Sequence, residues 1–119
     1  MAQKSSTYQE PTIKQNLVKF AKHNRIRSRP GRRDEINKAI LRFFEDLNGR
    51  IKGMKGFSVM NDSQDPQESI VLTFWETKEY MDAFYQPDNR VLSSLVEKLK
   101  PLFEEIPERK DYQLLHLAC

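Results

Sequence analysis

The segment Ile70-Val71-Leu72-Thr73-Phe74-Trp75 constrains the fold of this chain more than any other. It predicts a strand over residues 69–75 that is apolar on both faces, so each face needs a covering layer. The only tryptophan ends this strand, and the helical pattern Glu76-Thr77-Lys78-Glu79 follows at once. A large side chain with one N–H donor belongs at the rim of a core or in a cavity wall. We expect a site near this junction, with rim packing or a dimer interface as the alternative role for Trp75.

The remaining periodicity predicts the order βαββαβ. Ile36, Ile40, Phe43 and Leu47 are spaced to form one helical stripe, and Pro87 breaks the second helix. The predicted strands are residues 16–29, 57–61, 69–75 and 111–117, and the predicted helices are 34–47, 78–85 and 89–103. Interleaved right-handed β-α-β crossovers give an α+β, ferredoxin-like fold: a four-stranded antiparallel sheet with the helices on one face. The other face then lacks a cover, which predicts a homodimer packed through its sheet faces.

Length and composition favour one domain. The 119 residues divide into an expected flexible arm, 1–13, and a single domain, 14–119. The single cysteine, Cys119, allows no internal disulfide and no cysteine-based metal cluster, which suits a reducing compartment. The polar N-terminus does not look like a signal peptide, and no apolar run is long enough to span a membrane. We therefore expect a cytoplasmic protein that does not enter membranes.

Positive charge is concentrated near the N-terminus. Residues 1–33 hold nine of the 20 lysines and arginines but one of the 17 acidic residues. The basic residues either form a phosphate-binding stripe or line the solvated, partly paired face of a strand, which is the interpretation we favour for Lys19, Arg25, Arg27 and Arg29. No aromatic residues are interleaved with them for base stacking, so nucleic acid is disfavoured as a partner.

Several weak motifs gain weight from their order along the chain. They are Arg29-Pro30-Gly31-Arg32-Arg33-Asp34-Glu35-Ile36, Gly56-Phe57, Phe74-Trp75-Glu76-Thr77-Lys78-Glu79 and Ala83-Phe84. Over residues 16–117 this arrangement resembles the antibiotic biosynthesis monooxygenase family, which has the dimeric α+β barrel fold. The resemblance implies a cavity between sheet and helices in each monomer. Family members include cofactor-free oxygenases of quinols and polyketide phenols, heme-degrading oxygenases and an isomerase, so the fold leaves the chemistry open.

The closest local similarity is to the heme-degrading branch. His23-Asn24-Arg25-Ile26 resembles the first strand of that branch, and Asn24 falls on its functional asparagine. Phe84 stands where the branch has a tryptophan, and Ser94 stands where it has the iron-ligating histidine. Without that imidazole, this helix cannot hold ferric heme as the branch does. We expect no cofactor, and weak heme binding through a histidine remains the alternative.

Two residues are candidates for catalysis. Asn24 follows the alternation of Phe20 and Ile26, so its amide should point into an apolar region and needs a hydrogen-bond partner there. That partner is either a substrate oxygen or dioxygen, or a neighbouring strand or loop. His116 has the ordinary pKa of a base that works near neutrality, with a structural role as the alternative.

The candidates for contact with a substrate are Phe20, Trp75, Phe84 and Ser94. Together with the resemblance, they favour a cofactor-independent monooxygenase that acts on a small planar aromatic compound, either a quinol or a polyketide-like phenol. The alternative is a non-catalytic dimer that binds a hydrophobic metabolite or heme.

Overall fold

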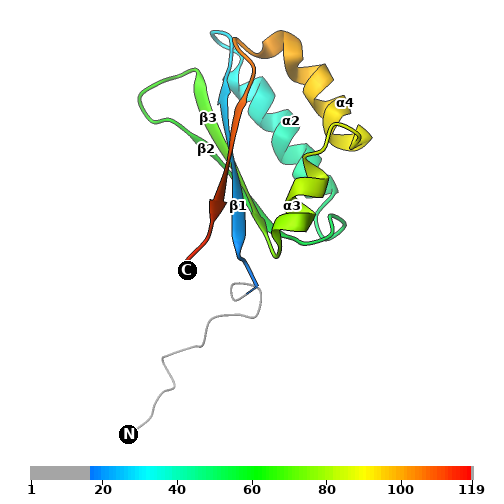
Figure 1. The fold of residues 1–119 in the computed structure, drawn as a ribbon. Coiled ribbons are helices and arrows are strands. Elements are labelled where there is room, and N and C mark those ends of the chain that lie inside the picture. Colours follow the sequence, from blue (N-terminus) through cyan, green and yellow to red (C-terminus); the bar gives the residue numbers. More distant parts are fainter. Residues whose placement is uncertain (1–16, 119) are drawn as a thin grey trace, which may run out of the picture.

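The computed structural model describes residues 17–118, and the expected arm, residues 1–13, lies outside this range. A four-stranded antiparallel sheet carries three α-helices on one face (Figure 1). The elements are β1 (Phe20–Arg27), α2 (Arg33–Asp46), β2 (Met54–Asn61), β3 (Glu68–Trp75), α3 (Lys78–Phe84), α4 (Arg90–Leu99), the 3-10 turn η2 (Lys100–Leu102) and β4 (Glu108–Gln113). The predicted α+β, ferredoxin-like fold is confirmed.

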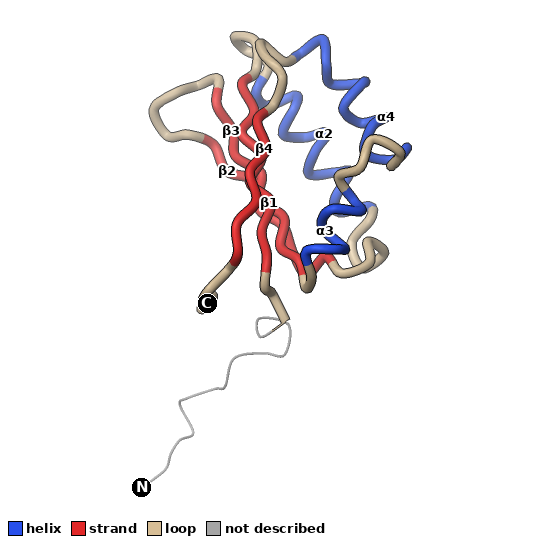
Figure 2. The backbone as a smooth tube through the Cα atoms, viewed as in Figure 1, coloured by secondary structure: helices blue, strands red, loops and turns tan. Residues whose placement is uncertain are grey.

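Strands β3 and β1 occupy the centre of the sheet, whose order is β2-β3-β1-β4 (Figure 2). Val71 of β3 lies opposite Asn24 of β1 and Val59 of β2. On its other side, Asn24 lies opposite Arg109 of β4. This register brings an asparagine and an arginine side by side on the face of the sheet that the helices cover.

The two faces of β3 are used differently. Every second residue, from Ser69 through Val71 and Thr73 to Trp75, is buried under the helices. The intervening residues Ile70, Leu72 and Phe74 are partly buried on the opposite face, and no helix among residues 17–118 covers that face (Figure 1). The expectation that β3 is apolar on both faces is therefore confirmed within the monomer.

Helix α2 supplies the main stripe of the core, because Ile36, Ile40 and Phe44 are all buried against the sheet. Helix α3 begins where the sequence predicts, since the Thr77 hydroxyl accepts a hydrogen bond from the backbone N–H of Tyr80 at 3.1 Å. The predicted break at Pro87 is also confirmed. Pro101, which has no N–H to donate, lies in η2, where the last helix ends as a 3-10 turn.

Three of the four predicted strands have wrong boundaries. β1 is Phe20–Arg27 rather than residues 16–29. β2 begins at Met54 rather than at residue 57, because a bulge between Met54 and Gly56 lets a glycine-containing stretch join the ladder. The last strand is Glu108–Gln113 rather than 111–117. This edge strand is held by backbone pairing to β1, and its side chains are exposed. The apolar leucines after residue 113 therefore predicted the strand in the wrong place.

Ion pairs neutralise part of the basic segment. Arg25 Nε lies 2.8 Å from Glu68 Oε1, and Arg27 contacts Asp65 at 2.7 Å and Glu104 at 3.1 Å. The paired-face interpretation is thus confirmed for both arginines. Donation from the backbone N–H of Gln67, together with the Arg27 guanidinium, holds the pKa of Asp65 below its ordinary value. These contacts fasten the β2–β3 loop to the end of β1.

The loop before β2 provides a test of the packing at the strand–helix junction. Gly49 and Gly53 both have a positive φ, of 78° and 81°, but a Cβ on Gly49 would meet open space, whereas one on Gly53 would collide with the ring of Tyr80. Gly49→Ala should cost about 1 kcal/mol of unfolding free energy from backbone strain. Gly53→Ala should cost about 1–3 kcal/mol more, because the collision adds overpacking. Urea unfolding measures both, and equal losses would contradict the packing described.

Candidate functional site

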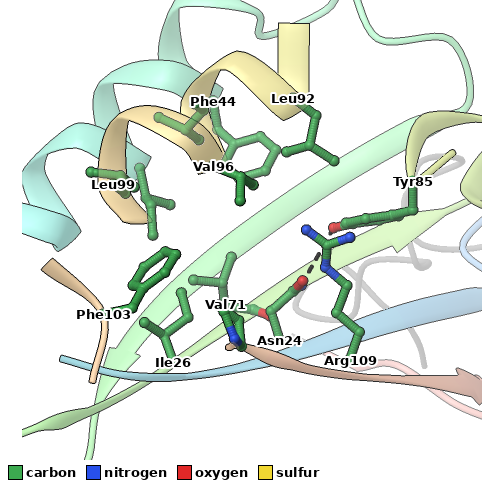
Figure 3. Close-up of a pocket in the computed structure, with 13 residues that line it drawn as sticks. Asn24, Ile26, Phe44, Val71, Tyr85, Leu92, Val96, Leu99, Phe103 and Arg109 are labelled. Atoms are coloured by element: carbon green, nitrogen blue, oxygen red, sulfur yellow. Dashed lines mark hydrogen bonds between the residues drawn. The ribbon is translucent and has the colours of Figure 1, made fainter. Parts of the chain in front are cut away.

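An apolar pocket lies between the helix-covered face of the sheet and α4 (Figure 3). Its volume is about 50 Å³. The lining residues are Asn24, Ile26, Ile40, Phe44, Val71, Tyr85, Leu92, Leu95, Val96, Leu99, Phe103, Pro107 and Arg109. Polar groups come from three of them, Asn24, Tyr85 and Arg109, and the close-up shows these three converging at one side (Figure 3).

The break between α3 and α4 shapes this pocket. The Asn89 side chain caps α4 by accepting from the backbone N–H of Val91 at 3.1 Å and of Leu92 at 3.3 Å. It also donates to the carbonyl of Phe84 at 2.7 Å, which ties the two helices together. The α4 residues Leu92, Leu95, Val96 and Leu99 then repeat at helical spacing and form the apolar wall that faces the sheet.

The amide of Asn24 is fixed by the bonds that its nitrogen donates. Nδ2 donates to the carbonyl of Val71 at 3.1 Å and to the hydroxyl of Tyr85 at 3.4 Å. No residue within 17–118 donates a hydrogen bond to Oδ1. This oxygen is not completely buried, and the side chain lines the pocket. The two sequence-based readings of Asn24 therefore combine: the nitrogen has a structural role, and the oxygen is left as an acceptor at the pocket.

Tyr85 connects the pocket to the core. Its hydroxyl lies 2.9 Å from Thr73 Oγ1, which also accepts from Trp75 Nε1 at 2.8 Å. Burial raises the pKa of the Tyr85 phenol, and this effect outweighs the hydrogen bonds from Thr73 and Asn24, which lower it. The phenol is therefore neutral near neutral pH and serves as a hydrogen-bonding group rather than as a base.

Two cations flank the Tyr85 ring. Lys22 Nζ and Arg109 Cζ each lie 4.9 Å from the ring centroid, a distance at which cations are attracted to aromatic faces. Lys22 also forms an ion pair with Asp111 of β4. Positive charge is thus placed at the polar side of an otherwise apolar pocket.

Of the six residues singled out in the sequence, Asn24 alone lines this pocket. Trp75 is fully buried in the core and packs on Phe84, with ring centroids 5.4 Å apart. Phe20 packs at the edge of the same core. Ser94 is exposed on α4, and His116 is exposed beyond the end of β4. The structure does not bring His116 and Asn24 together at the pocket.

Neither Arg109 nor Tyr85 is among the site residues expected from the sequence. The last strand was predicted from its leucines to begin at residue 111, which left Arg109 in a loop. The sequence carries no alternation that could have identified it, because residues 108–111 are all charged.

The pocket does not fit heme. Its lining offers no imidazole or thiolate, its phenol, Tyr85, is hydrogen-bonded to Asn24 and lies against Thr73, and its volume is about 50 Å³. The position that resembles the iron-ligand site, Ser94, is exposed. Elsewhere in residues 17–118, no group of three histidine, cysteine, aspartate or glutamate side chains is arranged to hold a metal ion. The same part of the chain contains no helix long and apolar enough to cross a membrane.

The fold and pocket define an α+β domain of the ferredoxin-like class, with an apolar pocket between its sheet and a helix and polar groups at one end of that pocket. The chain belongs to the antibiotic biosynthesis monooxygenase family, whose model matches residues 19–89. No curated protein matches the sequence.

Solved structures share the fold at low sequence identity. A protein assigned to the same family from Chloroflexus aurantiacus J-10-fl has a TM-score of 0.66 at 17% identity, covering 85% of this chain and 97% of that one. Another from Bordetella bronchiseptica gives 0.68 at 19% identity, with coverage of 82% and 98%. A protein of unknown function from Nitrosomonas europaea gives 0.72 at 14%, with coverage of 87% and 95%.

Proposed function

We propose that this protein is a cofactor-independent monooxygenase that oxidises a small planar aromatic substrate, a quinol or a polyketide-like phenol, in the pocket between the sheet and α4. The observation that carries the proposal is the acceptor oxygen of Asn24, held at the pocket by two bonds donated from its own nitrogen. Membership of the family supports the reaction class.

Each group at the pocket then has a defined task. The apolar side chains of α4 and β3 hold the ring and exclude water, and Asn24 Oδ1 accepts a hydrogen bond from a ring hydroxyl and orients it. For an anthrone, a ring CH₂ becomes C=O, one atom of O₂ enters the product and the other leaves as water. The substrate supplies all four electrons, so the step needs no external reductant. No carboxylate or imidazole lines the pocket within residues 17–118, and the first proton leaves to solvent.

The volume of the pocket limits how the substrate lies. A cavity of about 50 Å³ is smaller than the roughly 150 Å³ cavity that accepts benzene in an engineered protein. A planar ring must therefore extend into the adjoining opening or displace side chains of α4. That opening has a volume of about 210 Å³ and shares Tyr85, Leu92, Val96 and Arg109 with the pocket.

A second subunit is part of this proposal. Ile70, Leu72 and Phe74 are apolar and lie on the sheet face that no described helix covers. Tyr112, which is 45% exposed, and Met60, 44% exposed, belong to the flanking strands and share this face by register. A second copy packed face to face would bury these side chains and remove their apolar surface from water.

Oxygen uptake with a panel of quinols and anthrones tests the reaction. The wild-type protein should accelerate uptake above the rate without protein, and Asn24→Ala should lower kcat up to about tenfold, the equivalent of one neutral hydrogen bond that orients the substrate hydroxyl. Asn37→Ala is the matched control, because Asn37 is also buried but bonds Asn61 and Ser69 away from the pocket. Undiminished turnover in Asn24→Ala would contradict the role of Asn24. Binding of these compounds without oxygen uptake would contradict the reaction and support the alternative of a non-catalytic binding protein.

Sedimentation equilibrium tests the second subunit. The wild-type mass should be twice that of the 14.1 kDa chain, and Leu72→Lys should shift the equilibrium to the monomer because it places a charge in the proposed interface. Leu41→Lys, on the exposed side of α2, should leave the dimer intact. A wild-type monomer at all concentrations, or a Leu72→Lys dimer as stable as the wild type, would contradict the proposal.

A further inference from the structure

Arg109 occupies the boundary between the pocket and its opening. It lines both, and across the β1–β4 ladder it lies opposite Asn24. Its guanidinium lies over the Tyr85 ring, with Cζ 4.9 Å from the centroid (Figure 3). A cation attracted to a ring at this distance is restrained beside it, which places the guanidinium of Arg109 at the entrance to the pocket.

The hydrogen-bonding capacity of Arg109 is unused by residues 17–118. Arg25 and Arg27 form ion pairs with Glu68, Asp65 and Glu104. Asp111, the next residue on the same face of β4, forms an ion pair with Lys22 instead, and the adjacent Glu108 lies 3.6 Å from Arg25. Glu97 lines the same opening, yet no ion pair within 4.0 Å joins it to Arg109. The five donors of this guanidinium are therefore available to a ligand.

The surroundings favour an anion. An arginine fork matches a carboxylate in two parallel hydrogen bonds, and charge-assisted bonds of this kind are about twice as strong as neutral ones. Arg109 itself is exposed, but it adjoins the apolar lining of the pocket, so the ring of a ligand and its anionic group can be bound together. A neutral aromatic compound would use the apolar walls but leave this cation without a partner.

We propose that the pocket selects aromatic compounds that carry an ionised oxygen, a phenolate or a ring carboxylate, and that Arg109 is the residue that recognises it. The inference rests on the proposed function in that it uses the same pocket. For a phenolic substrate, Arg109 also compensates for the absence of a carboxylate or imidazole base among the described residues that line the pocket. A guanidinium beside the phenol oxygen stabilises the anion, so the proton can leave to solvent without a protein base.

Fluorescence titration with naphthalene derivatives separates charge from shape. The 2-naphthoate anion and neutral 2-naphthamide have similar size, and the wild type should bind the anion about tenfold tighter or more, the equivalent of one charge-assisted bond. Arg109→Gln should abolish this preference. Lys110→Gln is the matched control, since it removes the same charge from the next residue of β4, which points to the opposite face of the sheet. It should retain the preference.

The phenolate source is tested with 2-naphthol. Below the pH at which 2-naphthol ionises in water, the wild type should bind it as the naphtholate, visible in its absorption spectrum, and Arg109→Gln should bind it as the neutral phenol. A preference for naphthoate without bound naphtholate assigns the site to carboxylates, and bound naphtholate assigns it to phenols. Either result supports the inference.

Equal affinity of the wild type for 2-naphthoate and 2-naphthamide would overturn the inference, as would a preference that survives in Arg109→Gln. If Arg109→Gln fails to fold, Arg109→Lys keeps the charge but loses the fork, and it should bind 2-naphthoate with intermediate affinity. Because these titrations need no turnover, they are independent of the oxygenase. An Arg109-dependent preference without oxygen uptake refutes only the reaction, whereas oxygen uptake without the preference refutes only the inference.

Discussion

The hydroxyl of Thr73 is the contact on which the core and the pocket both depend. This fully buried oxygen accepts from the indole N–H of Trp75 at 2.8 Å and lies 2.9 Å from the Tyr85 hydroxyl. It thereby links the end of β3, where the core is densest, to the start of the α3–α4 connection. Because an unsatisfied buried indole or phenol is costly, this chain of bonds fixes where Tyr85 lies. Tyr85 in turn positions the amide of Asn24 and provides the surface on which Arg109 rests.

The pocket is built on a rigid side and a more adaptable one. Its floor consists of paired strands, with Asn24 and Val71 held by the central ladder. Its roof is α4, a ten-residue helix set off from α3 by the Pro87 break and capped by Asn89. A pocket of about 50 Å³ enlarges most readily on the side of this helix, since separating α4 from the sheet breaks no strand pairing. The floor would thus keep the polar groups in place while the roof adapts to the ring.

Sequence patterns predicted the fold well because they report on burial. The double-sided apolarity of β3 and the Pro87 break were predicted from the sequence. The predicted stripe of α2 was right for Ile36 and Ile40, which are buried, whereas Phe43 and Leu47 are partly buried and Phe44 completes the buried face. The edge strand was misplaced because its formation depends on backbone pairing to β1, which side-chain polarity does not reveal. Because the predicted strand began at residue 111, Arg109 was not recognised as a strand residue that faces the pocket. Asn24 was recognised through the resemblance and the alternation of its strand, whereas its partner Tyr85 and the Thr73 hydroxyl that Tyr85 contacts became evident only from three-dimensional contacts.

The central claim is that ligands bind between the sheet and α4, at the acceptor oxygen of Asn24. Nuclear magnetic resonance of the isotope-labelled protein during titration with 6-hydroxy-2-naphthoate, whose hydroxyl can donate to Oδ1 while its carboxylate faces Arg109, tests this binding site. We expect the NMR signals of the Asn24 side-chain amide and of the Val71 and Val96 methyl groups to shift together as ligand is added. The signals of the Asn37 amide, and of the Ile70 and Leu72 methyl groups on the opposite sheet face, should not shift. Shifts confined to Ile70 and Leu72, with Asn24 unmoved, would contradict it.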